Sequence, residues 1–172
     1  MIKNITFVIA VLETLNLDIN KIKDKIKNIK ALDGRGKILR IKYKNLNFNL
    51  IDESYNANPL SVKQSIWNLS NIKNNNHKYI LLGDMLELGK KSKKFHQDIS
   101  KVINNSDIDK VFIKGKKTLF TYKRLNKDKR GNILQNNEDI DSTLGKMISN
   151  NDYLMIKGSN ATGLNNFSKK MV

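Results

Sequence analysis

The chain has 172 residues, of which 39% are hydrophobic, enough for the core of one domain and too many for a disordered protein. It contains no cysteine, which excludes a disulfide framework and a thiolate metal site and is compatible with a cytoplasmic protein. Its 32 lysines and arginines against 16 acids give a net charge of +16, but the lysines are spread along the whole chain without a nucleic-acid-binding motif, which argues against nucleic acid as the partner.

The first 33 residues predict two helices. In the first, apolar residues recur at helical spacing: Ile5, Val8, Ile9, Leu12 and Leu15. The second is expected to begin near Asp18, a good N-cap residue, and to carry one apolar stripe: Ile19, Ile22, Ile26 and Ile29. A short coiled-coil seam would have the same pattern. The apolar run 7–12 is too short to span a bilayer and lacks the features of a signal peptide, so we expect no membrane span.

From Gly36 the apolar pattern changes from helical to strand-like. Residues 38–43 and 46–51 read as two strands joined at Lys44-Asn45, a plausible hairpin. A helix is expected over 59–73, because Pro59 suits the first helical position. Its candidate inward residues are Val62, Ile66, Trp67 and Leu69.

Short apolar runs then alternate with helical patterns. Strands are expected at 79–82, 111–113, 133–134 and 153–156, and helices at 95–103, 116–124 and 139–148. Such alternation predicts parallel βαβ units, so the fold class is α/β, a Rossmann-like, doubly wound and mostly parallel sheet with a short N-terminal helical appendage.

Three of the predicted strands end in polar or glycine-containing segments. These exits are 52–58, Gly83-Asp84 and Lys157-Gly158-Ser159. Any one of them could be a simple turn. Because the carboxyl ends of parallel strands share one edge, the three together predict a ligand-binding crevice there.

Some polar residues near these exits have two interpretations. Arg35, between Gly34 and Gly36, could reach a phosphate or belong to a hinge. Asp84 and Glu87, three apart, could pair on a helical turn to bind a cation or an amine, although a capping role explains Asp84 equally well. The two histidines, His77 and His96, lie in different elements without an acidic cluster, so we expect surface or packing roles and no metal site.

The run Asp52-Glu53-Ser54-Tyr55-Asn56-Ala57-Asn58-Pro59 resembles a signature of the Mur ligases, specifically of the MurF type. So do Gly34-Arg35, Leu82 to Gly89 followed by His96, and Lys157-Gly158-Ser159. The ordered motifs cover essentially the whole chain. At one position the chain departs from the family pattern, because Asn160 follows the Lys-Gly-Ser turn where the family usually has arginine.

The resemblance implies an ATP-dependent amide ligase. It would add D-alanyl-D-alanine to UDP-N-acetylmuramoyl-tripeptide through an acyl phosphate, in peptidoglycan synthesis. Residues 34–172 would be the C-terminal domain, and residues 1–33 a helical remnant of the central domain. These 172 residues contain no G-x-x-x-x-G-K-[ST] phosphate loop. That loop and the Mg²⁺ ligands are therefore expected in missing N-terminal and central domains, and this chain alone is expected to be inactive.

The resemblance also implies residue roles. Arg35 would meet ATP phosphate, Asp52 would meet the ribose, and Tyr55, Asn56 and Asn58 would line the nucleotide or the domain junction. The incoming dipeptide or product would face a second group of residues: Asp84, Lys157 and Ser159. No catalytic residue is assigned within this chain. Two alternatives stay open: a non-catalytic binding module derived from such a domain, and a basic nucleic-acid-associated protein.

Overall fold

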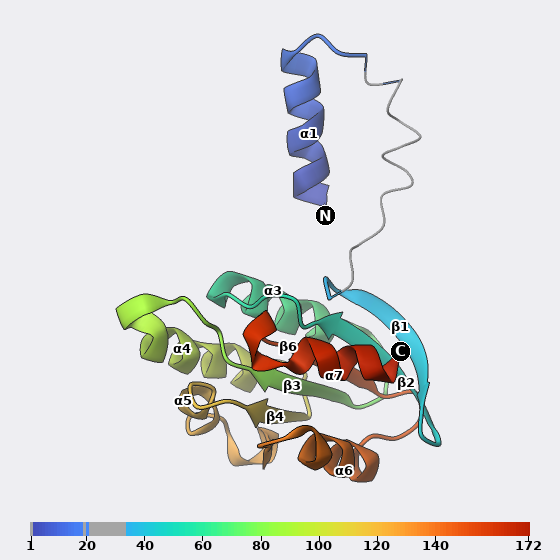
Figure 1. Cartoon of the computed structure of the whole chain (residues 1–172), viewed down its shortest axis with the longest axis vertical. Helices are drawn as coiled ribbons and strands as arrows, with labels where there is room; N and C mark the ends of the chain where they lie inside the picture. Colours follow the sequence, from blue (N-terminus) through green and yellow to red (C-terminus); the bar gives the residue numbers. More distant parts are fainter. Residues whose placement is uncertain (1, 19, 21–33) are drawn as a thin grey trace. The chain divides into compact units, whose positions relative to one another are not determined.

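The computed structural model describes residues 2–18, 20 and 34–172, which divide into two compact units, Met1–Leu32 and Asp33–Val172 (Figure 1). In the first unit, helix α1 spans Ile2–Thr14, where the apolar periodicity predicts it. The carboxylate Oδ1 of Asp18 accepts a hydrogen bond from the N–H of Asn20 at 2.9 Å. The helix predicted after Asp18 falls largely on residues 19 and 21–33, outside the described residues.

The second unit is built on one six-stranded sheet, with strand order β1-β2-β6-β3-β4-β5. The strands are β1 (Lys37–Tyr43), β2 (Leu46–Glu53), β3 (Lys78–Gly83), β4 (Lys110–Lys114), β5 (Arg130–Ile133) and β6 (Tyr153–Lys157). Only β1 and β2 pair antiparallel, and every other pair is parallel. The last strand in the sequence, β6, lies between β2 and β3, so the chain returns to the middle of the sheet.

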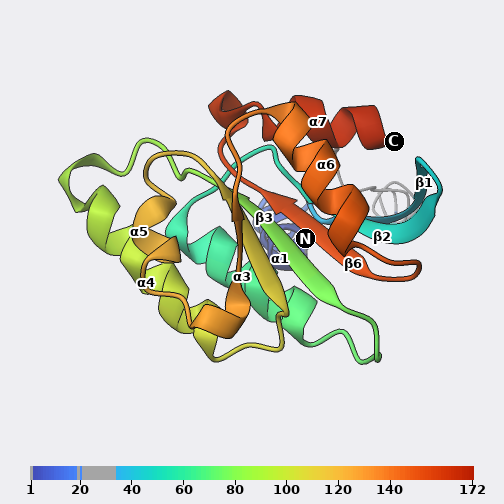
Figure 2. The same cartoon turned by 90° about the horizontal axis from the view of Figure 1, so that it is seen from below.

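Five helices cover this sheet: α3 (Pro59–Ser70), α4 (Ser92–Asn104), α5 (Leu119–Tyr122), α6 (Asn137–Met147) and α7 (Leu164–Met171). Short 3₁₀ turns are η2 (Gly89–Lys91), η3 (Lys127–Lys129) and η4 (Asn160–Thr162). Figure 2 shows α3 and α4 on one side of the strands and α6 and α7 on the other. This two-sided arrangement confirms the predicted doubly wound, mostly parallel α/β fold.

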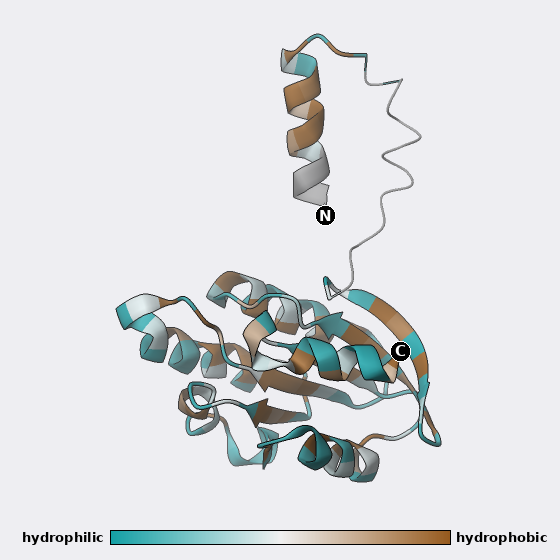
Figure 3. Cartoon of the chain, in the orientation of Figure 1, coloured by the Kyte–Doolittle hydropathy of each residue, from teal (hydrophilic) through white to brown (hydrophobic). Residues whose placement is uncertain are grey.

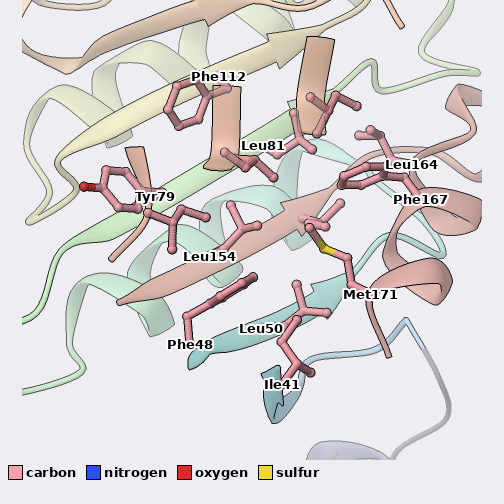
Figure 4. Packing of buried hydrophobic residues seen from close by; sticks show 14 of the residues in the cluster. Ile41, Phe48, Leu50, Tyr79, Leu81, Phe112, Leu154, Leu164, Phe167 and Met171 are labelled. Atoms are coloured by element: carbon pink, nitrogen blue, oxygen red, sulfur yellow. The ribbon is translucent and has the colours of Figure 1, made fainter. Parts of the chain in front are cut away.

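Each face of the sheet has its own apolar core. Successive strand residues point to opposite faces, so neighbouring residues of β6 belong to different cores. Leu154 and Ile156 pack on the α6 and α7 side, and Met155 packs on the α3 and α4 side. Figure 3 shows the central strands as continuous hydrophobic segments. Figure 4 shows the first core, a cluster to which the strands contribute Leu81 and Leu154 and α7 contributes Leu164 and Phe167. Strands buried on both faces explain why the runs at 79–82 and 153–156 are apolar throughout.

Local sequence explains how α3 begins directly after the polar run. The side chain of Asn58 accepts a hydrogen bond from the N–H of Ser61 at 2.8 Å, and Ser61 Oγ accepts one from the N–H of Asn58 at 3.1 Å. Pro59 occupies the first turn, as predicted. This reciprocal capping box satisfies two N–H groups and fixes the direction in which the chain leaves β2.

The structure confirms the hairpin at Lys44-Asn45, where Tyr43 pairs with Leu46 and Lys44 has a φ of +54°. For α3, one of the residues predicted to face inward is wrong, because Trp67 is 61% exposed. Val62, Ile66 and Leu69 form the buried stripe at spacings of four and three, and Trp67, one residue after Ile66, is turned about 100° away from it.

Two further elements differ from the prediction. Strand β5 begins at Arg130, three residues before the expected position, although Leu134 still donates its N–H to Ile113 O at 2.8 Å. Helix α7 was not predicted. Its buried residues Leu164, Phe167 and Met171 follow helical spacing, which would have identified it.

Candidate functional site

The three polar strand exits meet at one edge of the sheet. Ser159, after β6, donates its N–H to the main-chain oxygen of Asp84, after β3, at 3.0 Å. Its hydroxyl accepts the N–H of Leu86 at 3.0 Å and lies 3.5 Å from the main-chain oxygen of Ala57, after β2. One buried serine therefore ties together the ends of three parallel strands, as the shared-edge argument predicts.

Lys157 is a buried residue that holds the segment after β2 in place. Its side chain is 2% exposed, and Nζ donates to the main-chain oxygen of Asn56 at 2.8 Å and to Glu53 Oε2 at 3.3 Å. Burial lowers the pKa of Lys157, and the nearby Glu53 carboxylate opposes that shift. The ammonium group thus holds together the turn that displays residues 54–56.

Arg35 and Tyr55 form a stacked pair on that turn. The guanidinium carbon of Arg35 lies 4.9 Å from the centroid of the Tyr55 ring, which is half exposed. Gly34 makes the approach possible: its φ is +72°, and a Cβ there would lie 2.9 Å from Tyr55 Cβ. The pair borders a hollow of about 270 Å³, lined by Gly34, Arg35, Glu53, Tyr55, Asn56, Asn58, Ser61 and Lys157.

Asp52 lines a second hollow of about 250 Å³, which shares Gly34 and Tyr55 with the first. Its Oδ1 accepts hydrogen bonds from the N–H and the hydroxyl of Ser54, at 3.0 and 2.5 Å. Among the described residues, none donates to its Oδ2. One carboxylate oxygen therefore orders the turn, and the second is an acceptor that no described residue uses. Helix α7 and the turn before it contribute Asn160, Asn165 and Lys169.

Asp84 lines a larger cavity of about 560 Å³ at the ends of β3, β4 and β6. Its Oδ1 accepts from the N–H groups of Lys117 and Thr118, at 3.0 and 2.7 Å, so Asp84 holds the turn that leads into α5. The cavity lining is mainly apolar with a few polar groups: Asp84, Leu86, Lys114, Gly115, Lys116, Leu119, Ile133, Leu134, Gln135, Ala161 and Thr162. The predicted helical turn over Asp84 and Glu87 is wrong, because residues 84–88 form a loop.

The two histidines lie in different parts of the domain, His77 directly before β3 and His96 in α4. His77, before the strand, is exposed and its Nδ1 lies 2.9 Å from Asp109 Oδ1, a contact that raises the pKa of His77. His96 is 1% exposed, and burial lowers its pKa. Among residues 2–18, 20 and 34–172, no group of three or more histidines and acids could hold a metal ion. In the same described part of the chain, no helix is both long and apolar enough to cross a bilayer.

The structure sorts the predicted site residues into two neighbouring groups. Arg35, Tyr55, Asn56, Asn58 and Lys157 line one hollow, with Asp52 in the adjoining one. Asp84 lines the separate, larger cavity, and Ser159 bridges the two regions. Lys157 therefore lies with the residues expected at the nucleotide, not with Asp84. Sequence reasoning missed Asn165 and Lys169, since it did not predict α7.

Comparison with known proteins shows which family this chain resembles. Residues 34–160 match the Mur ligase family, glutamate ligase domain. The UDP-N-acetylmuramoyl-tripeptide–D-alanyl-D-alanine ligase of Rickettsia prowazekii is 29% identical over 161 residues, covering 94% of this chain and 35% of the relative. The enzyme with the same name from Bacillus subtilis is 28% identical, covering 87% of this chain and 34% of the relative. The chain thus spans about a third of the length of these curated relatives.

Solved structures have the same fold. The MurF ligase of Thermotoga maritima, in complex with ADP, matches with a TM-score of 0.72 at 23% identity, over 94% of this chain and 35% of that one. MurF from Acinetobacter baumannii matches with a TM-score of 0.74 at 20% identity, over 99% of this chain and 36% of that one. With the motifs at the strand ends and the match over residues 34–160, the chain belongs to the Mur ligase family.

Proposed function

We propose that this chain forms the C-terminal part of a MurF-type ligase. The complete enzyme would join the carboxylate of UDP-N-acetylmuramoyl-tripeptide to the amine of D-alanyl-D-alanine, through an acyl phosphate made with ATP. The observation that carries the proposal is the junction of three strand exits through Ser159 and Lys157. It gathers the family motifs, far apart in sequence, around adjoining hollows.

The residues around Gly34 suit a nucleotide. Arg35 offers a planar guanidinium whose donors match phosphate oxygens, and it needs little reorganisation because it already rests on the Tyr55 ring. The Oδ2 atom of Asp52 can accept hydrogen bonds from ribose hydroxyl groups. Asn56 and Asn58 border the same hollow as Arg35, where they would line the nucleotide or the domain junction.

The larger cavity suits the incoming dipeptide. Leu86, Leu119 and Ala161 offer apolar surface for small methyl side chains, and Lys114 offers a cation for a terminal carboxylate. Asp84 lies on the same lining, where a carboxylate can attract an ammonium group. Ser159 and Lys157 support this side indirectly, since both fix the strand ends between the cavity and the nucleotide hollows.

The other parts of the reaction would come from the remaining domains of such an enzyme. These parts are the UDP-sugar site, the phosphate loop and the Mg²⁺ ligands. The expected role of this domain is to add an arginine to the charge that phosphoryl transfer requires and to hold the amine. Residues 1–33 would form the end of the central domain, and the expected location is the cytoplasm.

The proposal is tested by joining this chain to the N-terminal and central domains of a MurF enzyme. ADP release is then measured with tripeptide precursor and D-alanyl-D-alanine. We expect turnover that depends on the dipeptide, and its loss by at least about a hundredfold in Arg35→Ala and Asp52→Ala. Arg124→Ala is the matched control, because Arg124 is an exposed arginine on the segment after α5.

Two results would contradict the proposal. Full turnover in both site variants would remove the roles of Arg35 and Asp52. No dipeptide-dependent ADP release from a folded joined enzyme would overturn the ligase assignment. If this chain alone still bound ATP in that case, a non-catalytic binding module would be the better description.

A further inference from the structure

The loop of residues 84–88, between β3 and η2, forms part of the wall of the 560 Å³ cavity through Asp84 and Leu86. It has no helix or strand hydrogen bonding of its own. Within it, Glu87 has a φ of +60°, a left-handed conformation that costs free energy in a residue with a side chain. Contacts from outside the loop must therefore hold this conformation.

Besides the bonds that Asp84 Oδ1 accepts from Lys117 and Thr118, three contacts hold the main chain of the loop, and two of them come from Ser159, which binds the main-chain oxygen of Asp84 and the N–H of Leu86. The third comes from helix α4. The N–H of Met85, between those two groups, donates to Nε2 of His96 at 3.1 Å. Met85 is 1% exposed, so His96 provides an acceptor for an N–H that water cannot easily reach.

His96 is itself held in one orientation and one tautomer. Its Nδ1 lies 2.8 Å from the main-chain oxygen of Ser92, which only accepts, so Nδ1 carries the proton. Since the Met85 N–H only donates, Nε2 is unprotonated. The main-chain oxygen of His96 also accepts from Thr121 Oγ1 at 2.6 Å, which ties α4 to α5. The ring is thus hydrogen-bonded on both sides and connects α4 to the loop in a fixed orientation.

We propose that His96 is a positioning residue for the amine substrate. Through its bond to Met85, it fixes the loop that presents Asp84 and Leu86 to the cavity. It touches no substrate, and its effect is on how tightly the cavity holds a small dipeptide with a free amine. This inference rests on the function proposed above, and on the use of the larger cavity for the dipeptide.

Two substitutions separate the contact to the loop from the rest of the side chain. In His96→Gln, the amide oxygen can reach the place of Nε2 and accept from Met85. In His96→Asn, the shorter amide can replace only Nδ1, so the bond to Ser92 is kept and the bond to Met85 is lost. His77→Asn is the matched control, because His77 lies at the other end of β3.

The first measurement is hydrogen exchange of the Met85 and Leu86 amides in this 172-residue chain, which requires no ligase activity. Exchange at both amides should be about tenfold faster in His96→Asn than in wild type, whereas His96→Gln and His77→Asn stay within about threefold. Protection within β3 and β6 should be equal in all four proteins, which separates a local effect from general destabilisation.

The second measurement is steady-state kinetics in the joined enzyme. His96→Asn should raise the KM for D-alanyl-D-alanine about tenfold and leave the KM for ATP unchanged, with recovery in His96→Gln. Unchanged amide exchange, or equal changes in both KM values, would overturn the positioning role. If the wild-type joined enzyme releases no ADP, the proposed function has failed. If Met85 amide exchange still responds to His96→Asn in that case, the contact between His96 and the loop has a structural role only.

Discussion

The ammonium group of Lys157 lies 2.8 Å from the main-chain oxygen of Asn56, a residue 101 positions earlier in the chain. This contact joins the carboxyl end of β6 to the turn after β2. The same turn carries Tyr55 and, stacked on it, Arg35. A buried lysine in the wall of the hollow thus sets the position of the candidate nucleotide site.

Replacing Lys157 by methionine should destabilise the fold by about 2–3 kcal/mol. The substitution keeps the apolar stem, but it removes the donor to Asn56 and leaves the partly buried Glu53 carboxylate without its cation. The free energy of unfolding is measured by denaturant titration of this chain. Lys63→Met, at an exposed position of α3, should change it by less than about 0.5 kcal/mol. Equal effects of the two substitutions would mean that the buried contact contributes no stability.

Gly34→Ala and Gly145→Ala should change stability in opposite directions. At Gly34 the left-handed φ and the Cβ of Tyr55, 2.9 Å from an added methyl group, predict a loss of about 2 kcal/mol. Gly145 lies inside α6 with nothing within 4 Å of an added Cβ, so Gly145→Ala should raise the free energy of unfolding by about 0.5–1 kcal/mol. Thermal unfolding of both variants tests this. A neutral Gly34→Ala would show that the turn before β1 adapts without strain.

The two histidines should make stability depend on pH in opposite directions. Burial lowers the pKa of His96 below 6.5, so the unfolded chain takes up this proton first as the pH falls. Stability from neutral His96 is therefore present above about pH 6.5 and is lost as the pH falls toward the lowered value. Hydrogen bonding to Asp109 raises the pKa of His77, so its smaller, exposed contribution is present below 6.5 and is lost as the pH rises through the raised value.

The measurement compares unfolding free energies from pH 8 to pH 5.5 in wild type, His77→Asn and His96→Gln. In His77→Asn the decline toward acid should be steeper than in wild type, with a limiting slope of about 1.4 kcal/mol per pH unit. In His96→Gln this decline should be absent. A decline of equal size in His96→Gln would assign the pH dependence to other groups.

Most of the fold could be predicted from the sequence because the strands are buried on both faces and the helices are amphipathic. Residues 79–82 and 153–156 are apolar throughout. Strand β3 extends one residue beyond the first run at each end, and β6 extends one residue beyond the second run at its carboxyl end. The prediction was weaker where the local signal is weak. Strand β5 contains Arg130 and Gly131, and its position depends on pairing with β4, which periodicity does not reveal.

The residues of the candidate site could be named from the sequence, but their grouping could not. Asp52, Tyr55 and Asp84 follow apolar runs, and this pattern identified them. Lys157 was expected beside Asp84, yet its side chain turns toward Glu53 and Asn56. Local sequence sets where a strand ends, whereas the direction of a side chain beyond that end depends on which strand lies next to it.

The sequence by itself determined that this is a doubly wound α/β domain with polar groups at three strand ends, because hydrophobic periodicity and turn residues are local properties. The tertiary structure alone decided that β6 lies between β2 and β3, and therefore that Ser159 meets both Asp84 and Ala57. It also decided that His96 supports the loop after β3. These relationships depend on strand order and helix orientation, which are set by long-range packing of the two cores and leave no local signal in the chain.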